Sequence, residues 1–282
     1  MASTSWTCDE GRFEGERGTE IYYRTWKPLE KIKALVALAH GQGDHSGRYS
    51  HVAEHLARAG YAIWAADYRG HGKSGGRRGH VDNFNDYLAD TDRVIRNAKE
   101  QNPQLKTFLI GHSLGGLVAL DYAEKHGSAL SGVVATAPLL RLKMKVPPWK
   151  ALIGRIFSSL TPTLSMKTGL EPKLLSRDQK IVRDYISDPL VHGVASTRFY
   201  TELLDAMDET IRDANRFTLP CLIMQGGNDG IVDPSATENF FKRVASADKT
   251  LRIYEGFYHE VLNEPEKEDL LSEITAWLSA RA

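Results

Sequence analysis

The sequence has little cysteine: Cys8 and Cys221 are the two thiols among its 282 residues. Two cysteines are too few for a disulfide scaffold or for a zinc site built on thiolates. A chain of this length needs neither, because it buries about three quarters of the surface that it exposes when unfolded. We therefore interpret Cys8 as a spare thiol and Cys221, which lies in an apolar run, as a small core side chain.

The sequence also lacks an excess of charge of either sign. Lysine and arginine together number 36, and aspartate and glutamate together number 36, so the formal net charge is zero. A general nucleic-acid binder usually carries a basic excess. We therefore expect no nucleic-acid partner.

Long hydrophobic runs are missing as well. Near the N-terminus the longest purely apolar run covers only residues 34–39, whereas a membrane span needs about 20 apolar residues. The first residues, MASTSWTCDEGRFEGE, contain neither the basic segment nor the apolar core of a secretory signal. We predict a soluble protein of the cytoplasm, for which peripheral contact with a membrane stays open.

Short apolar runs recur along the chain and predict strands. Most of them are continuously apolar, which is typical of a parallel sheet that is covered on both faces. Helical patterns lie between them: one at residues 50–59, one after Asp82 as its N-cap, and a final one around Trp277. This alternation favours a doubly wound α/β sheet. The predicted strands are residues 20–26, 34–39, 61–66, 107–110, 132–137, 219–225 and 251–254.

The alternation stops at residues 141–215, which hold helix-like segments and several prolines but no clear strand. We predict an α/β core formed by residues 1–140 and 216–282. Residues 141–215, which we call the insertion, are predicted to form a helical cap between two strands. Such a cap would lie over the C-terminal ends of the strands, where sheets of this kind bind ligands.

A candidate nucleophile lies in Gly111-His112-Ser113-Leu114-Gly115, which matches the pattern G-x-S-x-G. An apolar strand precedes this segment and an apolar helix follows it, as a nucleophile elbow requires. The glycines allow a tight turn that lifts the Ser113 hydroxyl above the sheet. The N-terminus of the following helix would then support developing negative charge.

A serine hydroxyl needs a base, and the base needs an acid to orient it. In this fold the chain order is serine, then an acid, then histidine. Asp229 and His259 fit, because each follows a predicted strand at the same edge of the sheet as Ser113. Asp233 is the alternative acid, and we prefer Asp229 because it lies closer to the end of its strand.

An oxyanion hole needs two backbone N–H groups that point at one position. The residue after the nucleophile, Leu114, would supply one of them. The segment His40-Gly41-Gln42-Gly43 follows a predicted strand beside the nucleophile strand, and Gln42 would supply the other. A plain glycine turn is the alternative interpretation of this segment.

Residues 70–75 spell G-x-G-x-x-G after a predicted strand. A dinucleotide site requires a helix to open directly there, and more loop follows instead. A phosphate-binding loop would require glycine at position 67, which is Asp67. We therefore do not assign a nucleotide site to these residues.

Taken together, several motifs make the chain, from about residue 20 onward, resemble the monoacylglycerol lipase and lysophospholipase branch of the α/β-hydrolases. The most specific are HGQGDHSGRY and RGHGKS; the others are GHSLGG, SDPL at 187–190, GGND at 226–229 and YH at 258–259. Some members carry a second histidine just after the catalytic one, where this sequence has Glu260 and the residues after it. The resemblance implies an α/β-hydrolase fold with a helical cap.

The resemblance also implies the roles of individual residues. It implies Ser113 as nucleophile, Asp229 as acid and His259 as base. Beyond the triad it implies an oxyanion hole from the amides of Gln42 and Leu114, Asp44 and Arg48 near the glycerol end of the substrate, and Tyr185 at the pocket wall on the cap side. The expected activity is hydrolysis of a monoacylglycerol through an acyl-enzyme, without metal or organic cofactor. The alternatives are a lysophospholipase, a carboxylesterase for shorter esters, and a non-catalytic receptor with the same fold.

The start of the insertion is basic. Residues 140–160 contain no acidic side chain but carry Arg141, Lys143, Lys145, Lys150 and Arg155. Apolar residues at helical spacing lie between these cations. We predict peripheral contact of this segment with an anionic membrane surface; the alternative is a cap helix whose apolar face only lines the acyl tunnel.

Overall fold

Within residues 5–144 and 148–282, which the computed structural model describes (backbone only over 148–153), eight strands form the central sheet. They are β1 (Trp6–Glu14), β2 (Glu20–Pro28), β3 (Ala34–Ala39), β4 (Tyr61–Ala66), β5 (Thr107–His112), β6 (Gly132–Thr136), β9 (Cys221–Gly226) and β10 (Lys249–Tyr254). Their order in the sheet is β1-β2-β4-β3-β5-β6-β9-β10. β1 and β2 are antiparallel to their neighbours, and all pairs from β4 to β10 are parallel.

The predicted strands are all present in this sheet, but β1 was not predicted. Its sequence, WTCDEGRFE, has only scattered apolar residues, and most of its side chains are exposed. β1 is an edge strand that pairs over its whole length with β2, so backbone hydrogen bonds rather than an apolar face hold it in place.

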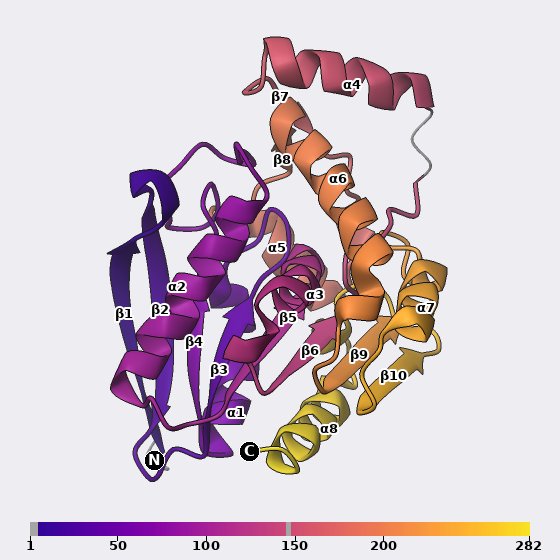
Figure 1. Ribbon diagram of the computed structural model, residues 1–282. Coiled ribbons are helices and arrows are strands. Elements are labelled where there is room, and N and C mark those ends of the chain that lie inside the picture. The colour runs from indigo at the N-terminus through magenta and orange to yellow at the C-terminus, as the bar shows by residue number, and fades with distance from the viewer. Residues whose placement is uncertain (1–4, 145–147) are drawn as a thin grey trace.

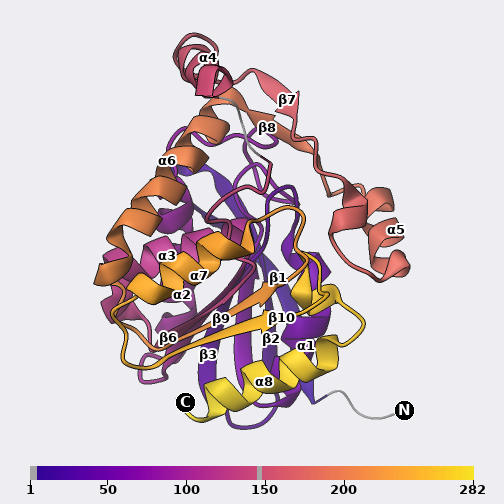
Figure 2. The same cartoon turned by 90° about the vertical axis from the view of Figure 1, so that its right-hand side faces the viewer.

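Helices cover both faces of the sheet (Figure 2). α1 (Ser50–Arg58) and α8 (Lys267–Ser279) pack on one face, and α2 (Asn85–Gln101), α3 (Leu114–His126) and α7 (Pro234–Arg243) pack on the other. The sequence of β3 is continuously apolar because both faces of this strand are buried. Leu35 and Ala37 belong to the core beneath α2 and α3, whereas Val36 and Leu38 belong to the core beneath α1 and α8. Short 3-10 turns occur at Glu16–Gly18, Ser46–Tyr49, Gly127–Ala129, Ala214–Arg216 and Val261–Asn263.

The start of α2 differs from the prediction that Asp82 is its N-cap. The helix begins at Asn85, and the Asp82 carboxylate contacts His80 at 3.2 Å instead. The free N–H groups of the first turn find other acceptors. The Asn83 side chain accepts from the N–H of Asn85, and the Glu202 carboxylate, from a distant helix, accepts from the N–H of Phe84. A tertiary contact has replaced the local cap.

Between β6 and β9 the chain forms a mostly helical arm that extends beyond the sheet (Figure 1). It contains α4 (Pro148–Leu160), β7 (Ser165–Lys167), a 3-10 turn (Pro172–Leu174), α5 (Gln179–Ser187), β8 (Val194–Ser196) and α6 (Thr197–Asp213). The expectation that the insertion has no strand was wrong, because β7 and β8 pair antiparallel. With three residues each, these strands are too short to show a sequence period.

Several large apolar side chains of the insertion are exposed, in contrast to the buried strands of the sheet. They belong to the end of α4, to the segment that leads into β7 and to β7 itself, and they are Ile156, Phe157, Leu160, Leu164 and Met166. No helix in residues 5–144 and 148–282 combines the length and the apolarity that crossing a bilayer would require.

Candidate active site

Ser113 lies at the turn between β5 and α3, in a strained backbone conformation with φ 55° and ψ −114°. A non-glycine residue in such a region costs about 1–3 kcal/mol, which the surrounding structure must offset. The turn is possible because its neighbours lack side chains. A Cβ on Gly111 would lie 2.1 Å from the carbonyl oxygen of Gly115, and a Cβ on Gly115 would lie 2.2 Å from the carbonyl oxygen of Ala39. The predicted serine elbow is therefore present.

The structure brings Ser113, His259 and Asp229 into one hydrogen-bonded chain. His259 Nε2 lies 2.9 Å from Ser113 Oγ, and His259 Nδ1 lies 2.8 Å from Asp229 Oδ2. Because a carboxylate only accepts, Nδ1 carries the proton and donates to Asp229, which leaves Nε2 to accept from the serine hydroxyl. All three side chains are buried.

Asp229 is held by more than the histidine. Its Oδ1 accepts from the N–H groups of Ile231 and Val232, and its Oδ2 accepts from the side-chain amide of Gln225. Asp233, the alternative acid, caps α7 through the N–H of Ser235. It does not contact His259 within the described structure, so the geometry favours Asp229.

Within this hydrogen-bonded chain, the interaction of Asp229 with His259 favours the charged form of both side chains. Burial opposes the charge of Asp229, but the adjacent His259 and the hydrogen bonds to the carboxylate bring its pKa below the ordinary value. Burial likewise opposes the protonated form of His259, but the Asp229 carboxylate outweighs burial and raises the pKa of His259. Beside it, burial and the nearby His259 lower the pKa of His112 to about 3, so His112 is neutral.

Beside the hydrogen-bonded chain of Ser113, His259 and Asp229, two backbone N–H groups have no partner in the part of the protein that the structure describes. No described residue accepts a hydrogen bond from the N–H of Gln42 or of Leu114. The loop that carries Gln42 passes close to the serine, since a Cβ on Gly41 would lie 3.5 Å from Ser113 Cβ. Both predicted donors are therefore near Ser113 and have no competing partner among the described residues.

Ser113 and His259 open onto a cavity of about 740 Å³. Most of its wall is apolar and comes from the insertion, with contributions from Phe157, Leu164, Leu174 and Phe199. A volume of this size is typical of a site for a small molecule. The polar residues of the core in this lining, together with Tyr185 of the insertion, form what we call the polar wall: Gln42, Asp44, His112, Ser113, Tyr185, His259 and Glu260. The insertion adds further polar residues to the lining, namely Lys167, Thr168, Glu171, Thr197 and Tyr200.

Beside the polar wall lies a buried charge cluster centred on Arg48. Its guanidinium donates to both carboxylate oxygens of Glu260 at 2.8 Å and to Asp44 at 3.1 Å. It also stacks over the ring of Tyr185 at 4.8 Å from the ring centre. Of the residues expected near the glycerol end, Asp44 and Tyr185 line the cavity, whereas Arg48 lies behind its wall.

Glu260 is a site residue that the motifs did not identify. Burial disfavours its charge, but the Arg48 guanidinium outweighs burial and lowers the pKa of Glu260. Asn263 donates to the same carboxylate at 2.8 Å. The backbones of His259 and Glu260 also donate to the carbonyl oxygens of Leu174 and Leu175 in the insertion. The position of Glu260 directly after the predicted base was the one feature of the sequence that could have identified it.

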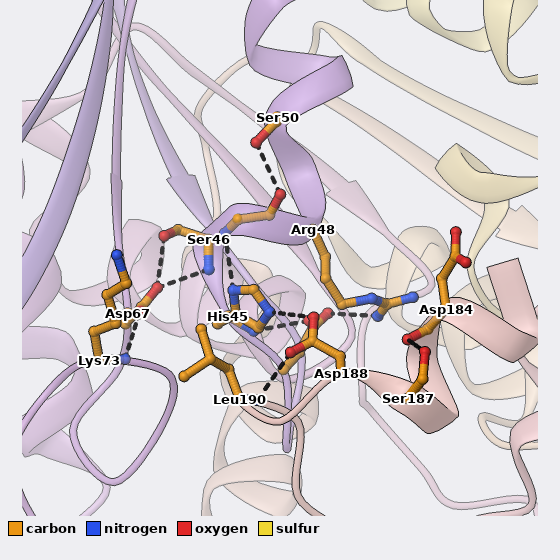
Figure 3. A network of polar contacts seen from close by, with 12 residues as sticks. His45, Ser46, Arg48, Ser50, Asp67, Lys73, Asp184, Ser187, Asp188 and Leu190 are labelled. Carbon is orange, nitrogen blue, oxygen red and sulfur yellow. Dashed lines mark hydrogen bonds and ion pairs between the residues drawn. The ribbon is translucent and has the colours of Figure 1, made fainter.

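The loop that carries Asp44 and Arg48 is anchored on both sides (Figure 3). Toward the insertion, His45 Nε2 lies 2.9 Å from Asp188. Toward the core, Asp67 accepts from both the N–H and the hydroxyl of Ser46, and from the N–H of Lys73. The glycine-rich segment at 70–75 thus supports this loop, and the next helix does not begin until Asn85.

A serine on a strand–turn–helix elbow, with histidine and aspartate after later strands of a mostly parallel sheet, defines an α/β-hydrolase fold. Comparisons agree with this class. The Hydrolase_4 family model, described as "Serine aminopeptidase, S33", matches residues 30–266. A monoacylglycerol lipase from Mycolicibacterium smegmatis is 32% identical to this chain and covers 96% of it and 97% of that protein.

A second relative and a solved structure extend the comparison. The phospholipase YtpA of Bacillus subtilis is 32% identical over 90% of this chain and 97% of its own length. The crystal structure of a monoacylglycerol lipase from Paleococcus ferrophilus is 34% identical, with a TM-score of 0.84 over 98% of this chain and 100% of that one. The chain belongs to the monoacylglycerol lipase branch of the α/β-hydrolases, as its motifs predicted.

Proposed function

We propose that this serine hydrolase cleaves the ester bond of a monoacylglycerol and releases a free fatty acid and glycerol. The observation that carries the proposal is the hydrogen-bonded chain of Ser113, His259 and Asp229 at the polar wall of a largely apolar cavity. An apolar chain fits the insertion side of that cavity, and an ester carbonyl would then lie at the serine.

In the first half of the reaction, Ser113 Oγ attacks the ester carbonyl while His259 Nε2 takes its proton. Asp229 stabilises the imidazolium that forms. The N–H groups of Gln42 and Leu114 donate to the oxyanion of the tetrahedral intermediate. The intermediate collapses as His259 returns the proton to the departing glycerol oxygen, and the acyl group stays on the serine.

In the second half, water attacks the acyl-enzyme. His259 takes a proton from the water, the oxyanion forms again, and the Ser113 oxygen leaves with the proton that His259 returns. The product is the free fatty acid. Each step uses only side chains and amides of this chain, so the mechanism requires neither metal nor organic cofactor.

The charges at the polar wall support a neutral leaving group. Two carboxylates, Asp44 and Glu260, belong to this wall, with one guanidinium, Arg48, behind them. The rest of the lining adds one cation, Lys167, and one carboxylate, Glu171, so it brings no excess of positive charge. Carboxylates accept hydrogen bonds from hydroxyl groups and repel phosphate. This favours glycerol over the phosphate-bearing headgroup of a lysophospholipid, which is the alternative substrate.

Contact with a membrane surface rests on different residues from those that the sequence suggested. Of the five cations, Arg155 pairs with Asp205 at 3.2 Å and Arg141 lies 3.7 Å from Asp233. The side chains of Lys145 and Lys150 lie outside the described residues. The start of the insertion therefore does not present five unpaired cations to an anionic membrane. The exposed apolar residues of the insertion, three of which, Phe157, Leu164 and Met166, also line the cavity, support docking on lipid by apolar contact.

The proposal is tested by comparing hydrolysis of a monoacylglycerol, a lysophosphatidylcholine with the same acyl chain, and a short water-soluble ester. We expect the highest kcat/KM for the monoacylglycerol, and loss of activity on all three with Ser113→Ala. A fluorophosphonate probe should label the wild type but not this variant. Equal or faster hydrolysis of the lysophospholipid would contradict the assigned substrate, and activity without Ser113 would contradict the mechanism.

A further inference from the structure

Three histidines outside the catalytic chain, two buried and one half-buried, hold three successive residues of the loop that carries Gln42. His40 and His71 come from the core, and His192 comes from the insertion. The rings of His71 and His192 lie 4.7 Å apart, and those of His40 and His71 lie 5.4 Å apart. The three rings thus form one cluster beneath the loop.

Each histidine meets a different residue of the loop. His40 Nδ1 lies 2.8 Å from the carbonyl oxygen of Gly41, and the N–H of Tyr68 donates to the other ring nitrogen, so Nδ1 carries the proton. The backbone N–H of His192 donates to the carbonyl oxygen of Gly43 at 2.9 Å. Between these two fixed points, the loop contact of His71 is with the side chain of Gln42, at 3.0 Å from Nε2 to Oε1.

The ring of His71 faces two hydrogen-bond acceptors but has only one proton to donate. Its Nδ1 lies 3.0 Å from the carbonyl oxygen of Arg69, so both ring nitrogens face oxygen atoms. A neutral imidazole has one N–H and can donate to only one of them. Burial, together with the nearby His40 and His192, holds the pKa of His71 well below its usual value, so the ring stays neutral.

The amide of Gln42 cannot relieve this shortage without a new conflict. Its Nε2 donates to the carbonyl oxygen of Val194 at 3.3 Å. If the amide turned over to offer His71 a donor, its oxygen would face that carbonyl. The Val194 carbonyl therefore sets the orientation of the Gln42 amide, with Oε1 toward His71 as the acceptor of its Nε2–H. Together, Val194 and His71 hold the Gln42 side chain in one arrangement.

We propose that His71 is a positioning residue for the oxyanion hole, which acts by holding the Gln42 side chain so that the Gln42 N–H points at the reacting carbonyl. This inference rests on the proposed function, because it assumes that Gln42 stabilises the oxyanion. Oxyanion stabilisation exists only in the transition state, so a disturbed donor lowers kcat and leaves substrate binding unchanged.

The experiment measures kcat and KM on a short water-soluble ester for His71→Ala, His71→Gln, Gln42→Ala and the double variant of His71→Ala with Gln42→Ala. We expect His71→Ala to lower kcat about 10- to 100-fold, less than the ~10²–10³-fold that follows complete loss of an oxyanion donor. KM should change by less than about twofold. His71→Gln keeps a polar group near Gln42 and should recover part of kcat.

The double variant tests whether His71 acts through Gln42. If it does, the double variant is no slower than Gln42→Ala alone. Affinity for a trifluoromethyl ketone, which forms a tetrahedral adduct with the serine, should fall in step with kcat/KM, whereas affinity for the fatty acid product should not change. His80→Ala is the matched control. Like His71, His80 lies in the loop between β4 and α2, and it contacts Ser196 of the insertion but none of residues 41–43.

The outcomes separate the two proposals. Activity that survives Ser113→Ala would remove the proposed function. A wild type that depends on Ser113, with His71→Ala, His71→Gln and Gln42→Ala all equal to His80→Ala, would remove the role of His71 alone. Additive effects in the double variant, or a rise in KM that matches the loss in kcat/KM, would also overturn it. If His71→Ala does not fold, His71→Gln and Gln42→Ala carry the same test.

Discussion

The two sides of the cavity are built in opposite ways. On the core side, Ser113 and His259 are only 6% and 3% exposed, and hydrogen bonds join their side chains to each other and to Asp229. On the insertion side, the lining residues Leu164 and Met166 are 45% and 56% exposed. The comparison teaches that the protein separates a rigid chemical apparatus from an apolar surface that is open to a partner or a substrate.

If this comparison holds, the largest losses come from the core side. Ser113→Ala and His259→Ala should each lower kcat by at least ~10³-fold, because members of a triad act as a unit. The double variant should be no worse than either single one. Single-turnover kinetics on a soluble ester would measure this, and two losses that multiply would contradict a shared mechanism.

The next largest loss of kcat should follow substitution of one aspartate but not of another four residues away. Asp229→Asn should lower kcat by about 10²–10⁴-fold, because an amide no longer holds His259 in the required tautomer. Asp233→Asn is the matched control, since Asp233 caps α7 and contacts Arg141. The reverse order of the two effects would show that the acid is assigned to the wrong residue.

Within the core side, stability should depend on the buried ion pair between Arg48 and Glu260. Glu260→Ala leaves Arg48 buried with less compensation and should lower the free energy of unfolding by about 3–5 kcal/mol. Glu266→Ala removes the exposed partner of Arg177 and should cost about 1 kcal/mol or less. Urea titrations of both variants at pH 7 would measure the difference.

The same pair gives a pH dependence with a defined sign. The folded pKa of Glu260 lies below its unfolded value of ~4.3, so the pair stabilises the fold above that pH. The contribution is lost as the pH falls through the lower, folded pKa. A Glu260 variant should therefore differ less from the wild type at pH 3 than at pH 7, and an equal difference at both would contradict this account.

Activity should also depend on pH through His259. The base must be neutral to accept the serine proton, and Asp229 raises its pKa above the usual ~6.5. We expect kcat/KM to rise through one ionisation whose midpoint lies above that value. A profile that is flat from pH 5 to 8 would argue against a histidine base.

Substitutions on the insertion side should have the smallest effect on turnover, and they should affect only substrate that is embedded in lipid. Leu160→Ser should weaken binding to lipid vesicles severalfold, and with it the hydrolysis of vesicle-embedded substrate, without changing kcat on a soluble ester. Leu29→Ser is the matched control, because Leu29 is 65% exposed but lies directly after β2, outside the insertion. Equal effects of both substitutions would contradict docking through the insertion.

The sequence predicts the parallel sheet well because its strands are buried on both faces, as the continuous run of β3 shows. It misses β1, β7 and β8 for the opposite reason: pairing of the backbone, not an apolar face, forms them. The position of Asp82 predicted a local cap, but Glu202 supplies a distant one. Local patterns carry no information about such long-range partners.

The candidate site divides in the same way. Ser113 has a local motif, and Asp229 and His259 follow strand ends, so chain order alone predicts their meeting. The ion pair of Glu260 with Arg48, and the contact of His71 with Gln42, join residues that are far apart in the sequence. Only the fold brings them together, which explains why neither was expected.

The consecutive backbone hydrogen bonds from His259 and Glu260 to Leu174 and Leu175 have a consequence for protein engineering. They attach His259, the proposed general base, and the neighbouring Glu260 to the insertion. An exchange of the whole insertion with that of a relative, made to alter chain-length preference, would also exchange the support of the base. Chimaeras that keep residues 172–176 and replace only the outer arm from α4 to β7 should retain turnover while the acyl end is redesigned.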